Sequence, residues 1–188
     1  MSGNSLLRLI VFVLGFLLSG CHYHFGQGVL SEKYETVSVP YIEGDGKGDL
    51  TAEVIKRLEK SGAFHYASSG GDLLLKVTVK GDDDDDVGFR YVRKKDGAIR
   101  KVIVPTETRR KVKAEVILQE GATGMIVHGP TEVVASIDFD HDFYYTRHEA
   151  NIFSLGQLND YDVAEDLVQR PLNKRLAQKI VDEITHCW

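Results

Sequence analysis

The sequence has little cysteine and none of the common short motifs of catalysis. Of its 188 residues only Cys21 and Cys187 are cysteines, too few for a disulfide framework or a zinc site built from thiolates. It contains no G-x-S-x-G nucleophile elbow, no H-E-x-x-H helix and no glycine-rich phosphate loop. Scattered Asp and His residues are present, but nothing in the sequence selects an acid–base pair among them. We therefore expect a protein that is not an enzyme.

The sequence also has no apolar run long enough to span a bilayer. Its longest run near the start, Leu9–Leu18, follows the single basic residue Arg8 and ends on Ser19-Gly20-Cys21. A basic residue, a short apolar run and a small-residue exit are typical of a secretory signal. The terminal cysteine resembles the lipobox of bacterial lipoproteins, in which the thiol receives diacylglycerol and the chain is cut before it. The alternative is an ordinary signal peptide or anchor with an incidental cysteine.

This interpretation divides the chain into three parts. We expect residues 1–20 to be a lipoprotein signal peptide, residues 21–36 a lipidated tether, and residues 37–188 a single domain large enough for its own core. Apart from the covalent lipid on Cys21, the sequence predicts no cofactor and no metal. In an oxidising compartment Cys187 is left either free or paired with another chain.

The first half of the domain predicts two strands and a helix. Val37–Ile42 alternates as a strand, and Pro40 favours an edge or a strand end because proline cannot donate to a ladder. Asp49 is expected to cap a helix over residues 50–61 that stops at Gly62. Asp72–Lys80 alternates as a half-buried strand. The apolar face of the helix is formed by Leu50, Val54 and Leu58.

A run of five acids, Asp82–Asp86, follows this strand. Such a run predicts a solvated, self-repelling loop, since it lacks the turn glycine of a calcium loop. The next segment, Gly88–Lys113, reverses the sign with ten Lys or Arg and two acids, and Asp96-Gly97 indicates a turn between two basic arms. Two interpretations stay open: a hairpin that binds a phosphate-rich partner, or a charged surface balanced by the acids. Export argues against nucleic acid.

The second half predicts two more strands and a closing helix. Residues 112–119 alternate, and residues 125–144 form one long strand with a bulge at Gly129-Pro130. The cluster Asp138, His141 and Asp142 resembles a ligand set, but alternation puts His141 on the opposite face from the acids. The main closing helix is expected to start at Pro171 after a short helical turn. Its apolar stripe consists of Leu172, Leu176, Ile180 and Ile184.

These elements predict an α+β fold. Two amphipathic helices need one apolar face, and alternating strands supply it, which gives a two-layer sandwich with both helices on one face of a mixed four-stranded sheet.

Several segments resemble the lipopolysaccharide-assembly lipoprotein LptE family. Residues 21–25, Cys-His-Tyr-His-Phe, resemble the start of the mature proteins of that family. Val37–Ile42 is similar to the first strand of the family, and Leu50-Thr51 and Leu73–Val77 to its first helix and second strand. The element order agrees over most of the mature chain, whereas the run of five acids and residues 154–158 depart from the family pattern.

The resemblance implies a lipoprotein of the Gram-negative outer membrane, facing the periplasm or the lumen of a barrel. It implies that the protein plugs an LptD-like β-barrel, assists membrane assembly of that barrel and contacts lipopolysaccharide during transport. Cys21 carries over as the residue that bears the acyl chains, palmitate among them. Charge and turn position select the candidate lipopolysaccharide-binding residues: Arg90, Arg93, Lys94, Lys95, Arg100 and Lys101. The alternative is a generic envelope lipoprotein that acts as a periplasmic scaffold or binds a polymer.

Overall fold

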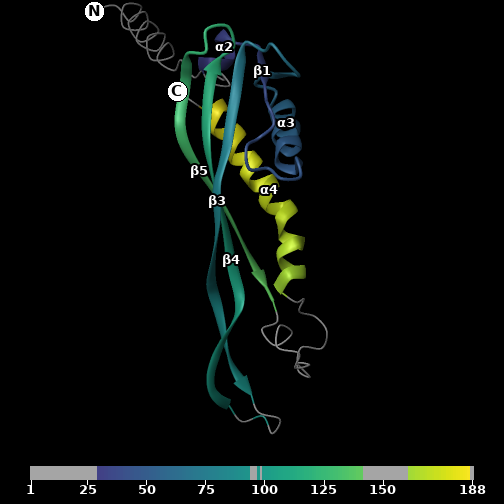
Figure 1. Cartoon of the computed structure of the whole chain (residues 1–188), viewed down its shortest axis with the longest axis vertical. Coiled ribbons are helices and arrows are strands. Elements are labelled where there is room, and N and C mark those ends of the chain that lie inside the picture. Colours follow the sequence, from purple (N-terminus) through teal and green to yellow (C-terminus); the bar gives the residue numbers. More distant parts are fainter. Residues whose placement is uncertain (1–28, 94–96, 98, 142–160, 187–188) are drawn as a thin grey trace, which may run out of the picture.

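The computed structural model describes residues 29–93, 97, 99–141 and 161–186. Short elements come first, then three long strands, then one long helix (Figure 1). In chain order they are α2 (Val29–Lys33), β1 (Thr36–Ser38), α3 (Asp49–Ser61), β2 (His65–Ala67), β3 (Leu73–Arg93), β4 (Ile99–Glu120), β5 (Ile126–Asp140) and α4 (Tyr161–Thr185).

The strands form one mixed sheet in the order β2-β1-β3-β4-β5. β1 is parallel to both β2 and β3, and the β3–β4 and β4–β5 pairs are antiparallel. The expected α+β class is therefore confirmed, with five strands in place of four, because the three-residue β2 is too short to leave a pattern in the sequence. Of the two expectations for Pro40, the strand end is confirmed and the edge is not: β1 lies between β2 and β3, and Pro40 follows the strand and leaves its ladder intact. The strand covers Thr36–Ser38 and is shorter than the expected Val37–Ile42.

Both α3 and α4 pack on the same face of the sheet, which we call the helix side; the other is the open face (Figure 1). The expected apolar faces are confirmed. The residues buried between the layers include Leu50, Val54 and Leu58 of α3, Leu172, Leu176, Ile180 and Ile184 of α4, and Leu73, Leu75, Val77, Ala114, Val116 and Leu118 of the sheet. Burial of this apolar surface is the main contribution to the stability of the fold.

Two details of the helices differ from expectation. α4 is one continuous helix with Pro171 inside it, so the predicted start at Pro171 is wrong. The buried stripe that follows Pro171, together with the contacts of Tyr161 and Glu165 with the sheet before it, outweighs the local cost of proline. Asp49 is not the cap of α3, because Gly48 occupies that position with a φ of 77°. The Asp45 carboxylate instead accepts hydrogen bonds from the backbone N–H and the hydroxyl of Thr51, at 2.7 and 2.8 Å.

The start of the described chain is packed against the end of the sheet where β3 begins. Within the segment assigned from sequence to the tether, α2 forms and Tyr34 is buried in the core. The Tyr34 hydroxyl donates to Glu120 Oε1 at 3.1 Å, and the backbone N–H groups of Glu35 and Thr36 donate to Asp72 Oδ2. These contacts fix the N-terminal side of the domain at this end of the sheet.

The two longest strands project beyond the helices. In Figure 1, β3 and β4 continue well past the first turn of α4 as a narrow hairpin, away from the end where α2 lies. The 21 residues of β3 correspond to a length of roughly 65 Å at about 3.3 Å per residue. β5 contains the expected bulge near Gly129, where its register with β4 shifts between Val116 and Leu118. None of the helices in the described ranges is long and apolar enough to cross a membrane.

Candidate functional site

The hairpin has two parts that differ in how many strands support them. β5 ends at Asp140, which pairs with Glu107 of β4, so three strands form the hairpin up to that point, and among the described residues only β3 and β4 continue beyond it as strands. We call residues 80–86 and 107–113 the shaft, and residues 87–106 the distal hairpin. The expected hairpin with its turn near Asp96-Gly97 is confirmed, since β3 ends at Arg93 and β4 begins at Ile99.

The run of five acids belongs to the shaft, so the predicted loop is wrong. Asp82–Asp86 continue β3, and they pair in register with Val112, Lys111, Arg110, Arg109 and Thr108 of β4. Lys111 bonds Asp85, which lowers the pKa of that carboxyl. Five adjacent acids would repel one another in an isolated strand. Here the neighbouring strand β4 places Arg109, Arg110 and Lys111 opposite three of them. Counting Lys80 and Lys113 as well, the shaft sets five cations against six acids, the five Asp and Glu107.

On the open face the pairing continues to the third strand. The Arg109 guanidinium donates two hydrogen bonds to Asp138 of β5, both at 2.7 Å. This bidentate geometry lowers the pKa of the Asp138 carboxyl and raises that of Arg109. Arg109 and Lys111 therefore bind carboxylates of the same sheet. For these residues of the basic segment, the interpretation that acids balance the charge holds.

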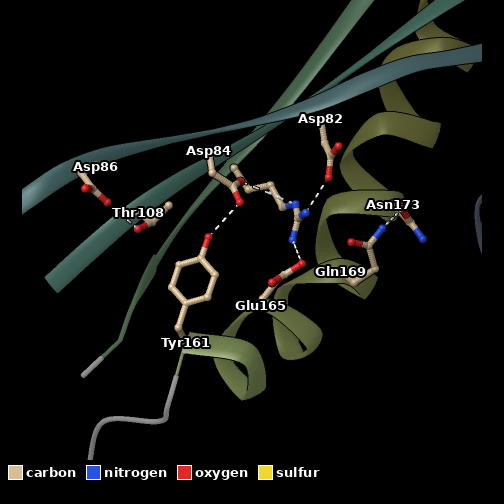
Figure 2. Close-up of polar contacts among 9 residues, drawn as sticks. Asp82, Asp84, Asp86, Thr108, Tyr161, Glu165, Gln169 and Asn173 are labelled. Carbon is tan, nitrogen blue, oxygen red and sulfur yellow. Dashed lines mark hydrogen bonds and ion pairs between the residues drawn. The ribbon is translucent and has the colours of Figure 1, made fainter. Parts of the chain in front are cut away.

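On the helix side, Arg110 links the sheet to α4. Its side chain is only 11% exposed and meets three carboxylates: Asp82 at 2.5 Å, Asp84 at 3.6 Å, and Glu165 of α4 (Figure 2). Burial disfavours the charged form of Arg110, but the contact with Glu165 and the hydrogen bond to Asp82 outweigh that effect and raise its pKa. The Arg110 hydrogen bond in turn lowers the pKa of Asp82.

Tyr161, the first residue of α4, joins the same cluster. Its hydroxyl donates to Asp84 Oδ2 at 2.8 Å, and burial together with this hydrogen bond raises the pKa of the hydroxyl to about 12 (Figure 2). The cluster of Arg110, Tyr161 and their carboxylates was missed at the sequence level, because Glu165 and Asp84 are far apart in the chain and no local pattern connects them. It holds the start of α4 against the shaft.

His141 closes the shaft from the end of β5. It is 4% exposed, its Nε2 lies 2.8 Å from the Thr108 hydroxyl, and its ring packs edge-on against Tyr161 at 5.0 Å. Asp138 faces the open side, so the prediction that His141 and Asp138 lie on opposite faces is confirmed; Asp142 is outside the described residues. Within residues 29–93, 97, 99–141 and 161–186, no three His, Cys, Asp or Glu side chains are placed to hold a metal ion together.

The distal hairpin carries the candidate lipopolysaccharide-binding residues. Arg90 pairs with the buried Val104 on the helix side and is half-buried. Arg93 ends β3, and Arg100 and Lys101 lie near the start of β4, so the strands bring these three cations to one end of the molecule. The side chains of these three, and Lys94 and Lys95 altogether, lie outside the part of the chain that is described, as do Cys21 and Cys187.

The distal hairpin carries an apolar stripe, of which the sequence indicated Phe89 and Tyr91 but not Ile103. Phe89 and Tyr91 are each 58% exposed, and Ile103, which pairs with Tyr91, is 56% exposed. The signal that reveals them is present in the sequence as alternation: Phe89 and Tyr91 are two apart in a strand and therefore share a face. Three large apolar side chains together on an exposed face are typical of a contact surface.

Comparisons with known proteins add structural likenesses of low identity. No family model and no curated protein matches the chain. A minor lipoprotein from Acinetobacter baumannii is 16% identical, with 81% of this chain and 91% of that chain covered and a TM-score of 0.49. The rare lipoprotein B from Shewanella oneidensis is 11% identical, with 80% and 93% covered and a TM-score of 0.49. An uncharacterized lipoprotein B from Nitrosomonas europaea is 9% identical, with 81% and 83% covered and a TM-score of 0.49. At identities of 9–16% and TM-scores of 0.49, these likenesses assign neither a family nor a function to this chain.

Proposed function

We propose that this chain is a lipid-anchored protein of the outer membrane that plugs an LptD-like β-barrel, assists the assembly of that barrel and contacts lipopolysaccharide on its way to the cell surface. In this proposal Cys21 carries the acyl chains, and the protein acts by binding, without catalysis and without a cofactor beyond the lipid. The proposed location rests on the lipobox, and the proposed partner rests on the family resemblance of residues 21–25. The distal hairpin supplies the contact with lipopolysaccharide.

The distribution of charge along the hairpin is the observation that carries the lipopolysaccharide contact. In the shaft, Arg109, Arg110 and Lys111 are all paired with carboxylates of the same sheet or of α4. Residues 87–106 instead contain six cations and one acid, a net charge of +5 in a chain whose formal net charge is −5. The phosphates of lipid A are suitable partners for such a segment, since arginine binds phosphate through two parallel hydrogen bonds.

The partner is tested by isolating the intact lipoprotein from outer membranes and identifying the proteins that remain bound. We expect one large outer-membrane barrel in the complex, and loss of surface lipopolysaccharide when the lipoprotein is depleted. Mass spectrometry of the purified protein should show diacylglycerol and an amide-linked acyl chain on Cys21, and Cys21→Ala should abolish both. If no barrel is recovered and surface lipopolysaccharide is unchanged, the protein is instead a generic envelope lipoprotein, a scaffold or polymer-binding module.

The lipopolysaccharide contact is tested by reversing charge in the distal hairpin. A cation near an anionic lipid surface contributes about 1 kcal/mol, so Arg93→Glu, Lys94→Glu and Lys95→Glu together should weaken lipopolysaccharide binding about 100-fold or more. The matched control reverses three exposed lysines of the helical body: Lys47, Lys56 and Lys60. Both triple variants change the net charge equally, so equal losses of binding would mean that only overall charge matters and would contradict the assignment to the hairpin.

A further inference from the structure

The apolar stripe of Phe89, Tyr91 and Ile103 lies on one face of the distal hairpin. Tyr91 pairs directly with Ile103, and Phe89 pairs with Pro105, so the strand register places these side chains on the open face. On the opposite face Val104 is only 3% exposed. Val104 is therefore buried on the helix side, whereas more than half of each large apolar side chain of the stripe is exposed on the open face.

Among the described residues, the part of the hairpin that carries the stripe consists of β3 and β4 alone. The last described contact of β5 with β4 is the hydrogen bond from the His141 backbone N–H to the Thr106 carbonyl, and no described strand pairs with the outer side of β3 there. A two-stranded ribbon is marginally stable in water unless one of its faces is covered. A surface that covers the stripe would thus both bury apolar area and stabilise the ribbon.

The charge of the same segment defines the chemistry of that surface. The apolar stripe lies within residues 87–106, whose net charge is +5, whereas the shaft next to it has a net charge of −1. A surface that suits both features has anionic groups beside an apolar layer. Aromatic and aliphatic side chains at the boundary between headgroups and acyl chains, with Lys and Arg on the phosphates, are typical of proteins that bind an anionic bilayer.

We propose that the distal hairpin docks on the surface of an anionic phospholipid bilayer, with the stripe of Phe89, Tyr91 and Ile103 at the boundary between the headgroups and the acyl chains. This inference goes beyond the proposed function, because it requires neither a barrel nor lipopolysaccharide. It gives the chain a second point of attachment that is separate from the lipid at Cys21.

The dimensions of the chain determine how two attachments fit one bilayer. The described chain begins at the end of the sheet where β3 starts, roughly 65 Å from the far end of that strand. The residues between Cys21 and Val29 span at most about 28 Å. Since this reach is shorter than the hairpin, both points engage one membrane only when the long axis of the molecule lies along the bilayer.

A tryptophan placed in the stripe tests the docking. The chain has one natural tryptophan, Trp188, so a full-length variant with Trp188→Phe and Tyr91→Trp reports from position 91 alone. It is reconstituted into vesicles of pure phosphatidylcholine, or of equal parts phosphatidylcholine and phosphatidylglycerol, with brominated acyl chains as quencher. We expect a blue shift of emission and quenching on the anionic vesicles only. The matched control carries the tryptophan at Glu59, exposed on α3, and should remain unquenched on both.

Equal emission and quenching of the two reporters on anionic vesicles would overturn the proposal. So would protection of position 91 that occurs only when a barrel protein is added, because the occupant would then be a protein. As a second measurement, Phe89→Ser, Tyr91→Ser and Ile103→Ser together should weaken binding to anionic vesicles while leaving its salt-dependent part, which the cations supply, in place, with the far-ultraviolet circular dichroism unchanged. The vesicles contain no lipopolysaccharide, so failure here leaves the proposed function standing, and failure to recover a barrel leaves this inference standing.

Discussion

Replacing Arg110 with methionine should destabilise the domain far more than the same change at the adjacent Arg109. Methionine keeps much of the apolar stem of arginine but leaves Asp82, Asp84 and Glu165 facing one another without their shared cation. Removing one partner of a buried ion pair costs about 3–5 kcal/mol. The Arg110 side chain is 11% exposed but its carboxylates are 30–56% exposed, so water screens part of the repulsion. We expect a loss of about 2–3 kcal/mol.

Thermal and urea unfolding measure this loss. In a domain of this size 1 kcal/mol corresponds to about 2–4 °C, so Arg110→Met should lower Tm by about 5–10 °C. Arg109→Met is the matched control, because Arg109 lies on the open face, is 43% exposed and has one main partner, Asp138; its Tm should fall much less. Adding Glu165→Gln to Arg110→Met should recover part of the lost stability, since one of the repelling carboxylates is then neutral.

The pH dependence gives an independent check on the same reasoning. The Arg110 hydrogen bond lowers the pKa of Asp82 in the folded chain, so its contribution to stability is present above the ordinary carboxyl pKa and is lost as pH falls through the folded value. The stabilities of the native chain and of Arg110→Met should therefore converge below about pH 4. Equal Tm shifts for the two arginine variants, or a difference that does not shrink in acid, would refute the role assigned to the cluster.

Three further changes have expected outcomes. Pro171→Ala should raise the free energy of unfolding by about 1–3 kcal/mol in urea titrations, because Pro171 is exposed inside a continuous helix where proline is costly; a decrease would mean that the ring makes a needed contact. Gly129→Ala should lower Tm, since its φ is 91° and a Cβ would lie 2.4 Å from a backbone oxygen, whereas Gly46→Ala, with open space around it, should leave Tm nearly unchanged. Tyr161→Phe should remove the tyrosine that ionises near pH 12 in an ultraviolet absorbance titration; an unchanged curve at that pH would contradict its burial.

The parts of the fold that were predictable from the sequence are those with a local period. The alternation over residues 73–79 and the four-residue repeat of α4 identify the faces that the core buries, because apolar spacing follows the geometry of strand and helix directly. Pro171 interrupts the helical pattern in the sequence, whereas α4 continues through Pro171 in the structure. There the burial of α4 after the proline, with the contacts of Tyr161 and Glu165 before it, exceeds what one missing hydrogen bond costs.

The shaft was not predictable in this way, because its partners are distant in sequence. Five consecutive acids read locally as a loop, and only the register with Arg109–Lys111 shows that a strand can hold them. The same register divides the ten basic residues into a paired group and a distal group, a division that composition alone cannot make. Glu165 is farther still along the chain, and its contact with Arg110 exists only once α4 lies on the sheet.

The hairpin is long relative to the short strands at its base, so a small rotation of the ribbon displaces its far end. β1 and β2 contribute three residues each, whereas the ribbon they adjoin extends roughly 65 Å from the same end. The contacts of Arg110 and Tyr161 with Asp84 lie nine residues, or roughly 30 Å, before the end of β3 at Arg93. A tilt of about 10° at that point would displace the far end by roughly 5 Å, about the spacing between neighbouring strands. The contacts with α4 therefore determine where the aromatic end lies.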